Sequence, residues 1–134
     1  MSESVVRAVQ DGIPYQVTLS DGVHQWLADE SAQLGGQDTG PNPHQLLLSA
    51  LGACTAITLA MYAQRKEIPL KGIDVRLNIL KEEGRPVVHT EIARSITLNG
   101  NLDEAQRQRL LEIANVCPLH KLLSGTVQIN SQLT

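Results

Sequence analysis

The sequence has 134 residues, which suits one hydrophobic core, so we expect a single domain over residues 1–134. Hydrophobic residues make up 42% of the chain and charged residues 19%, a composition that excludes an intrinsically disordered protein. The net charge of −3 arises without a cluster of lysines and arginines, so we expect neither nucleic acid nor an anionic membrane as a partner.

The first third of the chain favours β-strands. Its strand-like segments are VVRAV, YQVTL and VHQWLA, at residues 5–9, 15–19 and 23–28. The dipeptides Asp11-Gly12 and Asp21-Gly22, which are typical of tight hairpin turns, separate these segments. We therefore predict a three-stranded antiparallel meander, followed by a loop over the turn-rich residues 35–43.

A long central helix is expected after this loop. Asn42 suits its N-cap and Pro43 its first position, and the Gln45 side chain can reach back to the cap. Apolar residues then recur at steps of three and four, and Arg65 and Lys66 lie in the last turn, where cations favour the helix dipole. A chain of this size leaves such an apolar helix partly uncovered, so we expect a homodimer.

Cys54 lies on the apolar stripe of this helix, within the small-residue segment ALGACTA at residues 50–56. A glycine inside a helix costs about 1 kcal/mol relative to alanine, so we interpret Gly52 as a position that another backbone or a substrate approaches. Room beside a thiol is what a substrate needs. An inert buried cysteine is the usual finding on such a stripe, and this alternative stays open.

The second half of the chain predicts another hairpin and two helices. The expected elements are strands at residues 73–79 and 88–98, helices at 103–117 and 118–124, and a last strand at 126–130. Asp103 and Gln106 can form a capping box, while Pro118 ends one helix and opens the next. The predicted fold class is α+β, in the order βββ-α-ββ-αα-β.

Arg94 interrupts the apolar pattern of the second hairpin. Strict alternation would place it on the same face as Ile92 and Ile96, where a buried arginine needs a partner such as a thiolate or carboxylate. A one-residue bulge would turn Arg94 outward instead, and this is the arrangement we expect.

Cys117 falls at the predicted N-cap of the short helix, where unpaired backbone N–H groups stabilise a thiolate and lower its pKa. Lys121 and a protonated His120 would add to this effect. The alternative is an ordinary helix boundary with a buried cysteine. Cys117 and His120 also have Cys-x-x-His spacing, and His44 and Cys54 could complete a zinc site, but paired ligand motifs are missing and we expect no metal.

Two segments carry a resemblance to a known family. GGQDTGPNPHQLLLSALGACTAITLAMYA at residues 35–63 and NVCPLHKLL at residues 115–123 resemble the OsmC/Ohr superfamily of thiol peroxidases. With the N-terminal hairpins, the resemblance covers essentially the whole chain. It implies an OsmC-like fold, with antiparallel sheets around a long central helix, and an intertwined homodimer with active sites at the subunit interface. It also implies that Cys54 is the peroxidatic nucleophile and that Cys117 resolves its sulfenic acid as a disulfide.

One position departs from the family pattern. Organic hydroperoxide resistance members carry a glutamate after the Asn-Pro pair, which partners an arginine that holds the thiolate; here the residue is His44. No arginine of the N-terminal hairpins matches that arginine, so Arg7 and Arg94 are candidates by availability. His44 either replaces the glutamate as proton handler or faces solvent, and we favour solvent. The chain resembles a divergent branch of the superfamily.

These observations predict a thiol-dependent peroxidase that reduces organic hydroperoxides in oxidative stress defence. We expect no cofactor other than an external dithiol reductant. The N-terminus lacks the pattern of a signal peptide, and we identify no apolar stretch of about 18 residues, so we expect a cytoplasmic protein. Two alternatives stay open on the same fold: a non-catalytic module that binds a small ligand, and a disulfide-exchange or redox-sensing protein.

Overall fold

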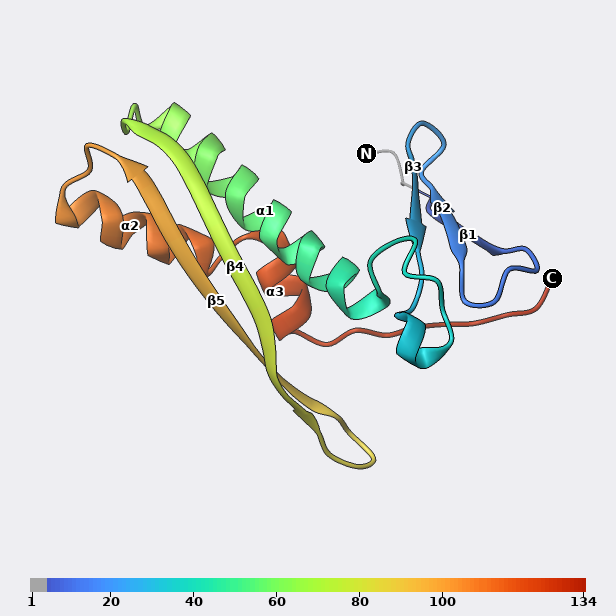
Figure 1. The fold of residues 1–134 in the computed structure, drawn as a ribbon. Coiled ribbons are helices and arrows are strands. Elements are labelled where there is room, and N and C mark those ends of the chain that lie inside the picture. The colour runs from blue at the N-terminus through green and yellow to red at the C-terminus, as the bar shows by residue number, and fades with distance from the viewer. Residues whose placement is uncertain (1–4) are drawn as a thin grey trace. The chain divides into compact units, whose positions relative to one another are not determined.

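The computed structural model describes residues 5–134 and divides the chain into two compact units, Met1–Leu47 and Leu48–Thr134. Antiparallel sheets and one long helix give an α+β fold, as the sequence predicts (Figure 1). The expectation of a single domain over residues 1–134 stays a prediction.

The first unit contains the predicted three-stranded meander. Its strands are β1 (Arg7–Gln10), β2 (Val17–Ser20) and β3 (Gln25–Ala28), paired antiparallel in the order β1-β2-β3. The turn between β2 and β3 is held by the Asp21 carboxylate, which accepts hydrogen bonds from the backbone N–H groups of Val23 and His24 at 2.9 and 2.6 Å. Gly22 adopts a φ of 95° in this turn, a conformation that favours glycine.

The loop after β3 is organised around a buried carboxylate. Asp29 is 2% exposed and accepts hydrogen bonds from the backbone N–H groups of Glu30, Gln37 and Thr39 and from the Thr39 hydroxyl. A short 3₁₀ helix, η1 (Ala32–Leu34), lies within this loop. Four hydrogen bonds to one side chain therefore fix the backbone that leads to the long helix.

Helix α1 (Pro43–Arg65) begins with the predicted cap. Gln45 N–H donates to Asn42 Oδ1 at 2.8 Å, and Asn42 N–H donates to Gln45 Oε1 at 2.9 Å, which forms a capping box. The buried residues of α1 recur every four positions: Leu51, Thr55, Leu59 and Ala63. Such spacing places them on one narrow stripe of the helix.

The other faces of α1 remain apolar. Ile57 and Met61 are 59% and 64% exposed. The helix is long and apolar enough by length and composition to span a membrane, which corrects the expectation that the chain contains no such stretch. The core helix of a soluble protein meets the same criteria.

The second unit combines a hairpin with three helices. After α1, it contains β4 (Leu70–Glu83), β5 (His89–Gly100), α2 (Glu104–Ala114) and α3 (Pro118–Ser124). Leu59 of α1 and Leu110 and Ala114 of α2 form the buried core, which packs against Ile73 of β4 and Ile96 of β5. The helices α1 and α2 thus cover the hairpin through one apolar cluster (Figure 1).

Two expectations for this unit are corrected. A Cβ atom added to Gly52 would lie 2.9 Å from Leu77 Cδ1, so the close protein neighbour of Gly52 is a side chain of β4 and not another backbone, while the approach of a substrate stays a prediction. Residues 125–134 contain no helix or strand, although a strand is expected at 126–130. Val127 and Ile129 alternate as in a strand, but they are 57% and 82% exposed and this segment has no paired strand among the described residues.

Candidate active site

Both cysteines lie where α1 meets the start of α3. Cys54 is half-buried on α1, and its sulfur accepts a hydrogen bond from the backbone N–H of Leu119 at 3.4 Å. Cys54 Sγ also lies 3.9 Å from the Thr58 hydroxyl, one turn further along the helix. Both cysteines are free thiols.

Cys117 occupies the predicted N-cap of α3, with Pro118 in the first turn. Its side chain is completely buried, and its sulfur accepts a hydrogen bond from the backbone N–H of His120 at 3.4 Å. The two sulfurs are therefore bound by adjacent backbone N–H groups of one helical turn, those of Leu119 and His120. This arrangement places Cys54 and Cys117 in a common site.

Arg94 points from β5 toward the helices, not outward. It alternates regularly with Ile92 and Ile96 on the same half-buried face, and the register irregularities of the hairpin fall in β4, one of them between Ile79 and Lys81. The expected outward orientation is therefore wrong. Polar groups from three helices satisfy the guanidinium, so this arginine can lie on the covered face of the sheet.

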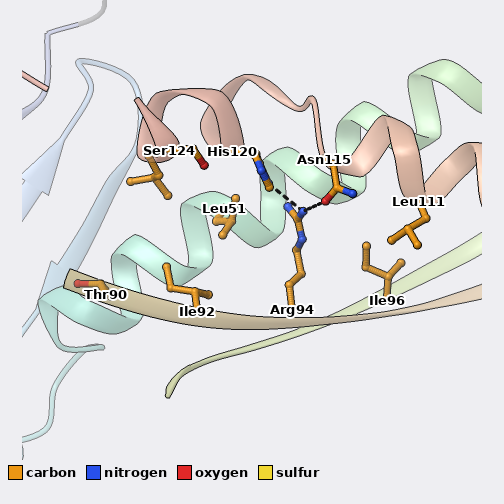
Figure 2. A pocket seen from close by; sticks show the side chains of 10 residues that line it. Leu51, Thr90, Ile92, Arg94, Ile96, Leu111, Asn115, His120 and Ser124 are labelled. Atoms are coloured by element: carbon orange, nitrogen blue, oxygen red, sulfur yellow. Dashed lines mark hydrogen bonds between the residues drawn. The ribbon is translucent and has the colours of Figure 1, made fainter. Parts of the chain in front are cut away.

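The partners of Arg94 come from α1, the end of α2 and α3. Its Nη1 donates to Thr55 Oγ1 at 3.1 Å, and its Nη2 lies 3.1 Å from Asn115 Oδ1 and 3.0 Å from His120 Nδ1. Figure 2 shows the guanidinium between Asn115 and His120. All three partner groups are uncharged when His120 is neutral.

His120 is held in its neutral form. Burial lowers the pKa of its imidazole, and the positive charge of Arg94 lowers it further. A neutral imidazole can accept the hydrogen bond from Arg94 at Nδ1, which places its proton on Nε2. The expectation that a protonated His120 assists Cys117 is thus corrected, since it is the backbone N–H of His120 that binds the sulfur. Lys121 is exposed on α3.

Several contacts favour the thiolate of Cys117. Burial alone would raise the pKa of this thiol, but hydrogen bonds from the His120 backbone, Cys54 and Thr55, together with the charge of Arg94, outweigh it and hold the pKa below its usual range. The Thr55 hydroxyl lies 4.0 Å from Cys117 Sγ. The Thr55 hydroxyl thus connects the guanidinium of Arg94 with the buried sulfur of Cys117.

A pocket of about 380 Å³ opens beside this network (Figure 2). Its lining is Leu51, Thr90, Ile92, Arg94, Ile96, Leu111, Asn115, His120, Leu123 and Ser124. Five of these are aliphatic residues, and Arg94 is the one arginine or lysine among them. Neither cysteine lines the pocket, so Arg94 connects the pocket on one side with Thr55 on the other.

The remaining candidates lie in the first unit. His44 is exposed in the first turn of α1, ten residues before Cys54, and Arg7 is exposed on β1. A role for either residue stays a prediction. Within residues 5–134, no group of three or more His, Cys, Asp or Glu side chains could hold a metal ion.

Two polar residues of the network escape the sequence analysis. Thr55 is a polar residue on an apolar stripe, between Leu51 and Leu59, and that position is a signal that could have identified it. Asn115 gives no such signal apart from its place two residues before Cys117.

Comparisons with known proteins agree on one family. A family model described as OsmC-like protein matches residues 36–132. An OsmC-like protein from Mycoplasma pneumoniae is 20% identical with a TM-score of 0.79, covering 92% of this chain and 89% of that one. An organic hydroperoxide resistance protein OsmC from Legionella pneumophila is 21% identical with a TM-score of 0.70, covering 93% and 91%.

The organic hydroperoxide resistance protein OhrB of Bacillus subtilis is also similar. It is 25% identical with a TM-score of 0.66, and the match covers 92% of each chain. A search of curated proteins gave no match. The two low-identity structures establish the likeness of the fold alone.

Proposed function

Since the chain belongs to the OsmC-like protein family, we propose that it is a thiol-dependent peroxidase that reduces organic hydroperoxides. The observation that carries this proposal is the pairing of Cys54 and Cys117 at adjacent backbone N–H groups of α3. The names of the relatives from Legionella pneumophila and Bacillus subtilis, both organic hydroperoxide resistance proteins, support the substrate class.

The different exposure of the two thiols supports the role that this proposal gives to each. Cys54 is half-buried, so a hydroperoxide can reach it, whereas Cys117 is completely buried. The Cys54 thiol gives up its proton and attacks a peroxide oxygen as the thiolate, the O–O bond breaks, and the leaving alkoxide takes up a proton to give an alcohol. The product on the protein is the Cys54 sulfenic acid.

Cys117 then resolves this intermediate. Its sulfur attacks the Cys54 sulfur, an S–S bond forms, and the hydroxyl group leaves as water after taking up a proton. An external dithiol reduces the disulfide and returns both thiols. In this scheme the protein needs no other cofactor.

The exposed apolar residues of α1 support an intertwined homodimer as the active form. Ile57 and Met61 lie on the uncovered side of the helix, at 59% and 64% exposure. A second copy of the chain would remove this surface from water. We place the protein in the cytoplasm, where thiols are kept reduced.

Free thiols counted before and after one equivalent of cumene hydroperoxide test the peroxidase. We expect the parent protein to lose both thiols, Cys117→Ser to accumulate a sulfenic acid, and Cys54→Ser to keep its thiol. The control for access is iodoacetamide, which should label Cys54 faster than the buried Cys117. Thiols that remain unchanged in the parent would overturn the proposal.

A binding module for a small amphiphilic ligand is the second candidate. The pocket beside Arg94 favours it, because five aliphatic side chains and one guanidinium line the cavity and neither cysteine does. Native mass spectrometry of the Cys54→Ser, Cys117→Ser double variant tests this function. A co-purified small ligand that is lost in Leu111→Asp would support binding, and a ligand-free protein would contradict it.

A further inference from the structure

We propose that Arg94 is a positioning residue that keeps the buried sulfur of Cys117 as the resting thiolate, so that Cys117 closes the disulfide on Cys54 without delay. This inference rests on the proposed peroxidase function and assigns the resolving step to a preformed anion. The structural basis is a buried sulfur, a neutral histidine and an arginine whose hydrogen-bond partners carry no charge.

The charge of Arg94 adds to the hydrogen bonds from the His120 backbone, Cys54 and Thr55 that lower the pKa of Cys117. The titratable groups that face Cys117 are Cys54 from α1, Arg94 from β5 and His120 from α3. Because His120 is neutral, Arg94 is the one of these three that carries a positive charge at neutral pH. A buried ionised sulfur is stabilised by such a compensating charge.

The geometry passes this effect through Thr55. The single proton of its hydroxyl points to the Leu51 carbonyl at 2.7 Å, while its oxygen accepts from Arg94 Nη1 at 3.1 Å. Because the Thr55 oxygen accepts from Arg94, the Thr55 proton can be donated to either of two acceptors. These are the Leu51 carbonyl and the Cys117 sulfur at 4.0 Å. Rotation of the hydroxyl toward an ionised sulfur supplies a charge-assisted hydrogen bond.

Asn115 and His120 hold the guanidinium in place for this task. Both accept from Nη2, at 3.1 and 3.0 Å, so Nη1 stays directed at Thr55. Neither is a carboxylate, and the positive charge of Arg94 is therefore not neutralised by its partners. The same charge repels a proton from His120 and favours its removal from Cys117.

A preformed Cys117 thiolate favours disulfide formation over further oxidation of the Cys54 sulfenic acid. The electron pair of Cys117 forms the S–S bond, the S–O bond of the sulfenic acid breaks, and the leaving hydroxide takes a proton from solvent. If closure is slow, a second hydroperoxide oxidises the sulfenic acid to sulfinic acid, which thiols do not reverse. Arg94 thus protects Cys54 by speeding closure.

A titration of the Cys117 thiolate by its ultraviolet absorbance tests the role of Arg94. In Cys54→Ser we expect a midpoint below the usual value of about 8.5. Addition of Arg94→Met should raise the midpoint by about one unit, which is a tenfold loss of thiolate below the midpoint. The matched control adds Arg76→Met, which removes a β4 arginine that is 84% exposed and should leave the midpoint unchanged.

A single-turnover experiment in the full protein measures the consequence. After one equivalent of cumene hydroperoxide, Arg94→Met should close the disulfide about tenfold more slowly at neutral pH, with its pH profile displaced upward by the shift found in the titration. Dimedone should then trap more Cys54 sulfenic acid than in the parent. Arg94→Lys, which keeps the charge, should recover part of the rate.

If Arg94→Met does not fold, a second pair of variants tests the same inference. Thr55→Val removes the hydroxyl and should raise the midpoint, whereas Thr55→Ser keeps the hydroxyl and should restore it. An unchanged midpoint and closure profile in the folded variants would overturn the inference. If Cys54 fails to react with hydroperoxide at all, the peroxidase proposal falls, while the titration alone still decides whether Arg94 holds the thiolate.

Discussion

The buried carboxylate of Asp29 shows how one residue can fix a whole loop. Four donors from three residues converge on it, led by the Thr39 hydroxyl at 2.6 Å. The Thr39 hydroxyl bond is the main cause that lowers the pKa of Asp29, and the backbone bonds from Glu30, Thr39 and Gln37 lower it further against the opposing effect of burial. The charged form of Asp29 therefore stabilises the folded chain.

The sign of the pH effect follows from this lowered pKa. A carboxyl group with a lower pKa in the folded state stabilises the protein above its unfolded pKa of about 3.9, and this contribution is lost as pH falls through the folded pKa. We expect Asp29→Asn to melt at a lower temperature at neutral pH and to lose less stability on acidification. Thermal unfolding monitored by circular dichroism at several pH values measures both effects.

Asp38 provides the matched control for Asp29. It is exposed in the same loop, with a φ of 53°, a conformation that asparagine tolerates well. Asp38→Asn should leave the melting temperature and its dependence on acid close to those of the parent. Equal behaviour of Asp29→Asn and Asp38→Asn would contradict the role given to the buried carboxylate.

Single residues also show where sequence reasoning succeeds and fails. Cys117 is identified as a helix N-cap because its signal, the following proline, is adjacent in sequence. The predicted orientation of Arg94 is wrong because its hydrogen-bond partners lie 39, 21 and 26 residues away, on three other elements. Long-range partners of this kind leave no pattern beside the residue itself.

At the scale of elements, local chemistry was sufficient for the helix starts. Both predicted capping boxes, at Asn42 with Gln45 and at Asp103 with Gln106, form as expected. The prediction of a last strand at residues 126–130 is wrong because a strand also needs a neighbouring strand to pair with. The alternating apolar pattern that includes Val127 does not provide one. A capping box depends on two residues three positions apart, whereas a strand depends on the tertiary arrangement.

The packing of α1 on β4 is set by Gly52 and Leu77. A Cβ on Gly52 meets Leu77 Cδ1 at 2.9 Å, so a larger side chain must displace the leucine. We expect Gly52→Val to lower the free energy of unfolding by about 1–3 kcal/mol, which is typical of overpacking. Urea unfolding of the parent and the variant gives this difference.

A double-mutant cycle identifies the clash. Leu77→Ala removes the atom that a residue at 52 would meet, so Gly52→Val should cost less in the Leu77→Ala background than in the parent. Equal costs in both backgrounds would show that the loss arises from the helix itself and not from its contact with β4.

At the scale of the whole molecule, the sequence indicates the α+β class and the family more clearly than the assembly. The family is identified because Cys54 and the Cys-Pro pair at Cys117 lie in two recognisable segments. The homodimer depends on surfaces that one chain cannot cover, and Ile57 and Met61 mark such a surface on α1. The homodimer stays a proposal that one substitution on α1 can test.

A charge on the exposed face of α1 should separate the proposed dimer. We expect Ile57→Glu to sediment as a monomer at concentrations where the parent is a dimer, because a carboxylate would be buried without a partner. Val87→Glu, at a residue that is 79% exposed in the tip of the hairpin, is the control. A parent protein that sediments as a monomer would contradict the dimer itself.

The two adjacent amides of α3 give the redox state a local signature. Leu119 and His120 donate their N–H groups to Cys54 and Cys117, and a thiolate is a stronger acceptor than a disulfide sulfur. Formation of the disulfide would therefore weaken both bonds at once and expose these amides to solvent hydrogen exchange. We expect the first turn of α3 to loosen if the proposed disulfide forms and to tighten when that disulfide is reduced.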